Sequence, residues 1–364
     1  MHRSLNCLSV LGHFLVLQFH YPVISAFGCI NKQQISCSQR RMVSSHWEAG
    51  NEIINLDPID LSKISVTRPQ LAKDNDYAAA ILNAWKQDAG ERTKNCISTC
   101  SRIQYNCNDK DETSLYGCVY KSANLREDGI SSVPGLILFH TGAGPQDMFL
   151  RWKADCLVND EELFPDGCVV LIADIIGDGE GWAWTDRSRY ETVRRSILVP
   201  DSKGERNELK CRVQAAIDTL SAQPNVDARN IAALGFCMGG HPILELARMQ
   251  LEAVKVLVTY HGVFDGVGRL CQVKIDDEQA NNIKPNILLC TGEDDPFIGK
   301  EDLSSAVTMF NQIGNCRVMT FGNTSHGFTN PAQNYNPSDA FAFNQDSYSK
   351  SWSATRTLLM DAFQ

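Results

Sequence analysis

The chain has 364 residues, with 34 basic and 43 acidic side chains and a formal net charge of −9 at pH 7. Hydrophobic residues make up 43% of it and charged residues 21%, which are globular proportions that exclude disorder over the whole length. The acidic balance argues against a nucleic-acid-binding protein, because such a protein normally carries a basic surface.

Residues 1–47 have the features of a targeting presequence. The first acidic residue is Glu48, and four basic residues precede it. Residues 8–24 are mostly apolar but are interrupted by histidine, glutamine and tyrosine, which is typical of a signal sequence rather than a membrane span. The acid-free, serine-containing stretch that follows is typical of a transit peptide. We expect this leader to be removed from the mature protein.

The junction Ser25-Ala26-Phe27 resembles the cleavage region of bipartite presequences in algae whose plastid came from a eukaryotic endosymbiont. This resemblance favours a plastid location. Secretion and mitochondrial import share most of the same features and stay open, as does an unprocessed N-terminus. The sequence after the leader contains no stretch that is apolar and long enough to cross a bilayer.

The remaining sequence predicts an N-terminal extension, residues 48–100, and one domain, residues 101–364. In the extension, residues 76–89 have the apolar spacing of a helix. In the domain, segments 103–105 and 115–120 are expected to pair as antiparallel strands. Continuous apolar runs, typical of strands buried on both faces, lie at 135–140, 168–173, 231–234, 254–260, 286–290 and 317–321.

Helical spacing alternates with these strands, at residues 149–163, 207–223, 301–313 and 349–363 and directly after Cys237. Buried strands that alternate with helices predict an α/β fold with a mostly parallel central sheet flanked by helices on both faces.

The sharpest local motif is Gly235-Phe236-Cys237-Met238-Gly239-Gly240, between a short strand and a helix. It has the pattern of a nucleophile elbow, with cysteine in the usual place of serine. A strained turn needs small neighbours, and the helix N-terminus that follows stabilises a thiolate. The alternative is a buried cysteine in a glycine-rich turn.

A nucleophilic cysteine needs a base, and the base needs an acid that orients it. Of the four histidines after the leader, His261 and His326 lie well beyond the elbow, and His326 follows the last predicted strand. Asp294 and Asp295 follow the strand at 286–290. The order nucleophile, acid, base therefore falls on strand-end loops, as in α/β hydrolases. His241 and His261 are expected to pack or to line the pocket.

Several motifs together resemble the dienelactone hydrolase (carboxymethylenebutenolidase) family of the α/β-hydrolase superfamily, over residues 105–364. They are Leu136-Ile137-Leu138-Phe139-His140, the elbow, Gly292-Glu293-Asp294-Asp295-Pro296-Phe297-Ile298 and Ser325-His326-Gly327-Phe328. The resemblance implies Cys237 as nucleophile, His326 as base and Asp295 as its acid. From the elbow turn we expect the Met238 N–H in the oxyanion hole, with a second donor from the Thr141-Gly142 backbone, and the chemistry needs no cofactor or metal.

Two positions depart from the family's prototype. A glutamate that interacts with the resting thiol is replaced by Thr141, and an arginine that grips the substrate carboxylate is replaced by Asn330. The resemblance therefore does not fix dienelactone as the substrate. Residues after the strand at 168–173 lie where loops line the pocket of such a sheet: Trp182 and Trp184 are candidates for an apolar wall, and Arg187 or Arg189 for holding an anion. The alternative for this segment is a surface excursion with aromatic packing.

The predicted function is cysteine-dependent hydrolysis of a small-molecule ester or lactone through an acyl-thioester. The alternative is a non-catalytic α/β-hydrolase fold that binds a ligand. A class I glutaminase is disfavoured because His241 and Phe328 stand where that family needs glutamine and glutamate. The cysteines Cys96, Cys100, Cys107 and Cys118 fall close together. We expect free thiols there, with a local disulfide or a metal site as alternatives.

Overall fold

The structure is a computed structural model, and it describes residues 53–54, 74–89, 99–107, 113–122, 125, 132–177, 179, 187–271 and 284–364. The predicted presequence lies outside these described residues, as do Cys96, Trp182 and Trp184. Residues 51–364 form one compact unit, which includes the helix predicted in the N-terminal extension. No helix in the described ranges combines the length and the apolar character that a bilayer crossing requires.

Nine strands in the described ranges form one sheet, in the order β1-β2-β3-β5-β4-β6-β7-β8-β9. The first three strands and β5 pair antiparallel, and the pairs from β5 to β9 are parallel. The strands are β1 (Ile53–Ile54), β2 (Thr99–Asn106), β3 (Ser114–Lys121), β4 (Val133–Phe139), β5 (Val169–Ala173), β6 (Val226–Phe236), β7 (Val254–Tyr260), β8 (Asn286–Gly292) and β9 (Asn315–Phe321). The mostly parallel sheet and the antiparallel pair of β2 and β3 confirm the sequence prediction.

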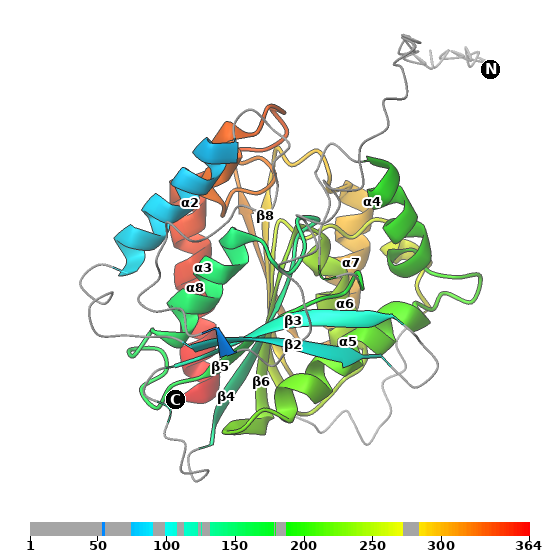
Figure 1. The fold of residues 1–364 in the computed structure, drawn as a ribbon. Coiled ribbons are helices and arrows are strands. Elements are labelled where there is room, and N and C mark those ends of the chain that lie inside the picture. The colour runs from blue at the N-terminus through cyan, green and yellow to red at the C-terminus, as the bar shows by residue number, and fades with distance from the viewer. Residues whose placement is uncertain are drawn as a thin grey trace, which may run out of the picture. The chain divides into compact units, whose positions relative to one another are not determined.

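Helices cover both faces of the sheet (Figure 1). One face carries α2 (Asp74–Ala89), α3 (Met148–Val158) and α8 (Gln345–Phe363), and the other carries α5 (Asn207–Ser221), α6 (Gly240–Arg248) and α7 (Lys300–Ile313). The remaining short elements are α4 (Arg187–Val193), the π-helix η2 (Arg194–Leu198), and the 3-10 helices η3 (Cys237–Gly239), η4 (Val267–Arg269) and η6 (Pro331–Tyr335).

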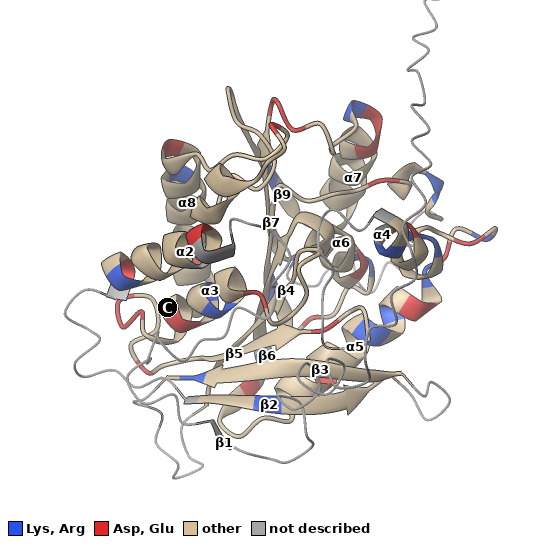
Figure 2. Ribbon diagram, turned by 45° about the horizontal axis from the view of Figure 1, so that its top comes forward, with Lys and Arg blue, Asp and Glu red and all other residues tan. Residues whose placement is uncertain are grey.

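Two apolar cores, one on each face, hold these layers together. The strands β4, β5, β6, β7 and β8 are buried on both sides, which is why their sequences are continuous apolar runs. Charged side chains lie mostly on helices and loops, and few lie on the central strands (Figure 2). This arrangement leaves the ends of the strands and their loops as the place for polar chemistry.

Two details differ from the sequence expectations. The helix predicted over residues 149–163 ends at Val158, because Asn159 closes it with bonds from its backbone and side chain to Asp155. The strand at 231–234 is longer, since it starts at Val226.

The expectation of free thiols around residues 96–118 is wrong for Cys107, which forms a disulfide with Cys211. The two cysteines are 104 residues apart, and they meet because the end of β2 lies beside the start of α5. Cys100 and Cys118 are free and buried. A pairing between distant segments depends on tertiary packing, which local cysteine spacing does not reveal.

Candidate active site

Cys237 lies where β6 ends and the turn into α6 begins. Its φ angle is +55°, a left-handed conformation that residues with a side chain rarely adopt, so the backbone is strained there. A Cβ atom at Gly235 would collide with the carbonyl group of Gly239, and one at Gly239 would lie 2.6 Å from the carbonyl oxygen of Phe139. The flanking glycines of the motif are therefore required by the close approach of β4, β6 and the turn.

His326 and Asp295 form a buried hydrogen-bonded pair. His326 Nδ1 lies 2.7 Å from Asp295 Oδ2, and both residues are buried. The second oxygen of Asp295 accepts a bond from the Phe297 N–H at 2.9 Å, which fixes the carboxylate. Asp294, the neighbouring candidate from the sequence, is exposed. The structure thus pairs His326 with the acid that the family pattern selects.

The two loops that carry this pair are tied together directly beyond the sheet. Glu293 N–H donates to the Phe321 carbonyl, and Asp294 N–H donates to the Thr324 carbonyl. Gly292 allows this contact, because a Cβ atom there would collide with the Thr324 carbonyl group. The loop after β8 is therefore held against the loop after β9, and this contact brings acid and base together.

The imidazole of His326 interacts with Cys237 as well as with Asp295. Burial by itself would lower the pKa of His326, but the charge of the Cys237 sulfur and the hydrogen bond to Asp295 outweigh it and raise the pKa to about 10. Aromatic rings surround the imidazole, with the ring centroids of Phe297 and Phe341 at 4.9 Å and 5.3 Å. The three residues thus make a chain of contacts from sulfur to carboxylate.

Two backbone N–H groups, one after β6 and one after β4, have no acceptor among the residues that the structure describes. Met238 lies in the first turn of the helix after β6, where N–H groups have no intrahelical partner. In the loop Thr141–Gly144, Ala143 N–H donates to Thr141 Oγ1, and Gly144 N–H donates to the Thr141 carbonyl. Within the described ranges, Gly142 N–H makes no hydrogen bond. The loop therefore offers the Gly142 N–H as a free donor.

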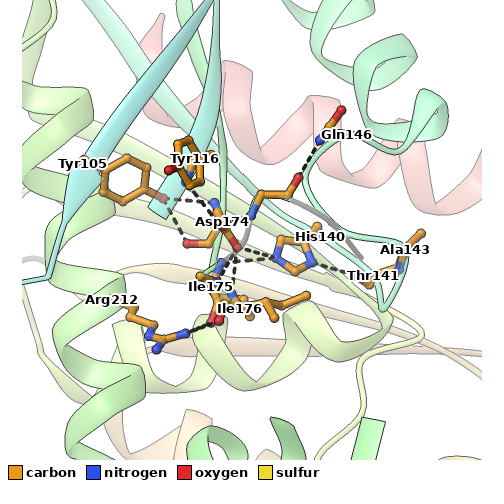
Figure 3. Close-up of polar contacts among 12 residues, drawn as sticks. Tyr105, Tyr116, His140, Thr141, Ala143, Gln146, Asp174, Ile175, Ile176 and Arg212 are labelled. Atoms are coloured by element: carbon orange, nitrogen blue, oxygen red, sulfur yellow. Dashed lines mark hydrogen bonds and ion pairs between the residues drawn. The ribbon is translucent and has the colours of Figure 1, made fainter. Parts of the chain in front are cut away.

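Figure 3 shows how His140 fixes the orientation of this loop. Its Nδ1 lies 2.6 Å from the Thr141 carbonyl oxygen, which can only accept, so Nδ1 carries the proton. Its Nε2 then accepts from the Ile175 N–H at 3.2 Å. Since the Thr141 carbonyl is held from two sides, the Thr141–Gly142 peptide cannot turn over without breaking both bonds.

Asp174 anchors the neighbouring loop in the same network (Figure 3). Its buried carboxylate accepts four backbone N–H bonds, from Tyr116, Ile176, Gly177 and Gly179. Burial would raise its pKa, but the nearby His140 ring, with Nε2 3.8 Å from Asp174 Oδ1, and the bonds from the loop backbone lower the pKa below the usual value. Gln146 Nε2 donates to the Gly179 carbonyl at 2.7 Å and links the loop to residues 141–147.

The remaining predicted pocket residues are not all placed beside Cys237. Arg187 begins α4, and its side chain lies outside the described residues. His261 is buried, with its ring edge-on to His326 at 4.8 Å between centroids and its Nε2 3.0 Å from Thr329 Oγ1. His241 faces a buried charge network instead, with contacts to Arg206 and Asp265 at 3.0 Å.

The sequence patterns do not predict the roles of His140 and Asp174. In the sequence, His140 is the last residue of a family motif, and Asp174 follows directly after a predicted buried strand. A carboxylate at the end of a buried strand is a sequence signal that indicates a polar role for Asp174 at this edge of the sheet. In the described ranges, no group of three or more His, Cys, Asp or Glu residues could hold a metal ion.

The dienelactone hydrolase family model matches residues 128–363, more than half of the chain. The chain belongs to the dienelactone hydrolase family. As a member of this family, the protein is a hydrolase that acts on ester bonds, and its mostly parallel sheet with flanking helices is the α/β-hydrolase fold.

Individual similarities agree with this assignment. A dienelactone hydrolase-like promiscuous phosphotriesterase, P91 from metagenomic libraries, is 26% identical, with a TM-score of 0.55 over 73% of this chain and 99% of its own. A solved structure called m3DLH is 27% identical, with a TM-score of 0.54 and the same coverage of both chains. An uncharacterized protein of Caenorhabditis elegans, K02A2.1, is 27% identical over 46% of this chain and 99% of its own.

Proposed function

We propose that this family hydrolase cleaves carboxylic esters or lactones with Cys237 as nucleophile, through an acyl-thioester. The observation that carries the proposal is the chain of contacts from Cys237 to His326 and from His326 to Asp295. A cysteine in a strained turn beside an oriented imidazole is the arrangement that nucleophilic catalysis needs. An intact pair of this kind favours catalysis over a role limited to ligand binding.

In the first half of the reaction, the Cys237 sulfur, with its proton already held on His326 Nε2, attacks the carbonyl carbon of the ester. The carbonyl oxygen becomes an oxyanion, and the free N–H groups of Met238 and Gly142 stabilise its charge. The bond to the alcohol oxygen then breaks, and His326 gives its proton to that oxygen. In a lactone, the released hydroxyl stays attached to the acyl group.

In the second half, water attacks the thioester carbon while His326 takes a proton from it. The same two N–H groups stabilise the second oxyanion. The carbon–sulfur bond breaks, the acid leaves, and the proton taken from water stays on His326 beside the released Cys237 sulfur, which restores the starting state. Asp295 keeps the imidazole in the tautomer with a proton on Nδ1, which leaves Nε2 available for both transfers.

The test replaces the proposed nucleophile. Cys237→Ala should lower kcat for p-nitrophenyl acetate and for dihydrocoumarin by at least about a thousandfold, because the covalent step is lost. Cys316→Ala, a half-buried cysteine in β9, is the matched control and should leave kcat unchanged. Mass spectrometry during turnover should trap an acyl group on Cys237. Unchanged turnover by Cys237→Ala would overturn the proposal.

A further inference from the structure

Helix α2 lies upstream of the family match, which begins at residue 128, yet it is built into the same core. Ile81 and Trp85 on this helix are 0% and 3% exposed. The helix packs against α3 and against η6, the short helix that follows the His326 loop. A segment outside the shared family region therefore contacts two elements of the candidate active site.

Two reciprocal hydrogen bonds fix α2 against α3. Trp85 Nε1 donates to Asp155 Oδ2 at 2.7 Å, and Trp152 Nε1 donates to Asp88 Oδ2 at 3.0 Å. Each helix thus supplies one tryptophan donor and one aspartate acceptor, three residues apart. These bonds set the position of α2 along the axis of α3.

The same packing of α2 on α3 places Tyr77 beside the start of α3. Tyr77 precedes Trp85 by the same number of residues as Asp147 precedes Asp155, so the two helices meet again about two turns away. At that level, Tyr77 Oη accepts a hydrogen bond from Asn330 Nδ2 at 3.0 Å. Its hydroxyl faces Asp147 Oδ1 at 3.5 Å, at the long end of the range for a hydrogen bond.

The partners of Tyr77 lie at the ends of the two loops that carry the proposed machinery. Asp147 caps α3 by accepting from the Phe149 N–H, and its own N–H donates to the Gly144 carbonyl of the oxyanion loop. Asn330 ends the loop that starts at His326, where its N–H donates to the Gly327 carbonyl. The Tyr77 hydroxyl therefore bridges the loop of the base and the loop of the oxyanion donor.

We propose that Tyr77 is a positioning residue, which holds the His326 loop and the 141–147 loop in the relative positions that catalysis requires. This inference rests on the proposed function, because it assigns Tyr77 an effect on the Cys237–His326 reaction. Catalytic groups must be held to within about 0.5 Å of their productive geometry, so a bridge between their loops affects rate more than substrate binding. It also makes the N-terminal helix part of the working active site.

The test is Tyr77→Phe, which keeps the ring and removes only the bridging hydroxyl. We expect kcat for p-nitrophenyl acetate to fall about ten- to a hundredfold with KM nearly unchanged, since small displacements of reacting groups have effects of this size. The rate of Cys237 alkylation by iodoacetamide at pH 6 should fall in parallel. Gln87→Ala, at an exposed position of the same helix, is the control and should change neither rate.

A double-mutant cycle separates the bridge from general packing. Asn330→Ala should lose at least as much rate as Tyr77→Phe, since it also removes the bond from the Ala332 N–H that caps η6. Adding Tyr77→Phe to Asn330→Ala should lower the rate little further, because the bond that the two residues share is already absent. Multiplicative losses, an equal loss in Gln87→Ala, or unchanged kcat in Tyr77→Phe would each overturn this inference. Turnover retained by Cys237→Ala would instead refute the proposed function, so the two failures are distinguishable.

Discussion

The role of Asp295 depends on how its loop orients and fixes the carboxylate. One carboxylate oxygen accepts from the Phe297 N–H and the other contacts His326 Nδ1, so neither is free to rotate away. Its neighbour Asp294 has the same chemistry but is exposed. The difference comes from the loop, which directs adjacent side chains in different directions.

At this scale we predict that Asp295→Asn lowers kcat by about a hundred- to ten-thousandfold, because the amide loses the charge that orients the imidazole. The pKa of His326 should fall from about 10, since Asp295 is one of the groups that raise it. The pH dependence of kcat, together with NMR titration of the ring, measures both effects. Asp294→Asn is the matched control, and an equal loss there would contradict the assignment.

The interface of α3 with α8 contains a buried lysine inside a cage of aromatic rings. The Lys153 ammonium lies 3.4 Å from the ring centroid of Trp152 and 4.2 Å from that of Tyr348, and it donates to Tyr348 Oη at 2.6 Å. Burial lowers the pKa of Lys153 from 10.5 to about 8. The folded protein therefore releases this proton more readily than the unfolded chain does.

The sign of the pH effect on stability follows from this difference. Below pH 8 both states hold the proton, and the folded state bears the full cost of burying the charge. Between pH 8 and 10.5 the unfolded chain binds more protons, so the contribution of Lys153 to the free energy of unfolding rises with pH across this window.

We predict that the paired variant Lys153→Met with Tyr348→Phe is more stable than the unaltered protein at pH 7, by about 1–2 kcal/mol. Both partners are replaced so that no buried hydroxyl is left unpaired. The gain should shrink towards pH 10.5, and urea unfolding at several pH values measures it. A gain that is independent of pH would show that Lys153 is not the cause.

On the scale of the whole molecule, one of the two cores is completed by helices from opposite ends of the compact unit. Helix α2 contributes Ile81 and Trp85 to one core, and α8 closes the same face with Leu358 and Leu359. The family match covers residues 128–363 and therefore omits α2, β2 and β3. The folded unit of this chain is larger than that match.

We predict that a chain beginning at residue 91, without α2, is less stable by at least about 5 kcal/mol, because it loses one buried isoleucine and one buried tryptophan. A chain beginning at residue 51 keeps the entire compact unit and is the control. Thermal unfolding monitored by circular dichroism compares the two. Equal Tm values would mean that α2 does not contribute to the core.

The sequence by itself determined the local features of this protein. Continuous apolar runs and helical spacing predicted the strands and helices, because the direction in which successive side chains point along a helix or strand depends only on neighbouring residues. The glycines around Cys237 indicated a tight turn for the same reason, and the structure shows why each is needed. The order of Cys237, an acid at 294 or 295, and His326 on strand-end loops also followed from the pattern of a mostly parallel sheet, and the family resemblance selected Asp295.

Only the tertiary structure decided which distant residues meet. Three such interactions are the disulfide between Cys107 and Cys211, the support of the 141–144 loop by His140, and the contact of Tyr77 with Asn330. No local sequence pattern encodes any of them. Tyr77 and Asn330 are separated by 253 residues. Such contacts arise from how layers pack around the sheet, and packing depends on the whole chain at once.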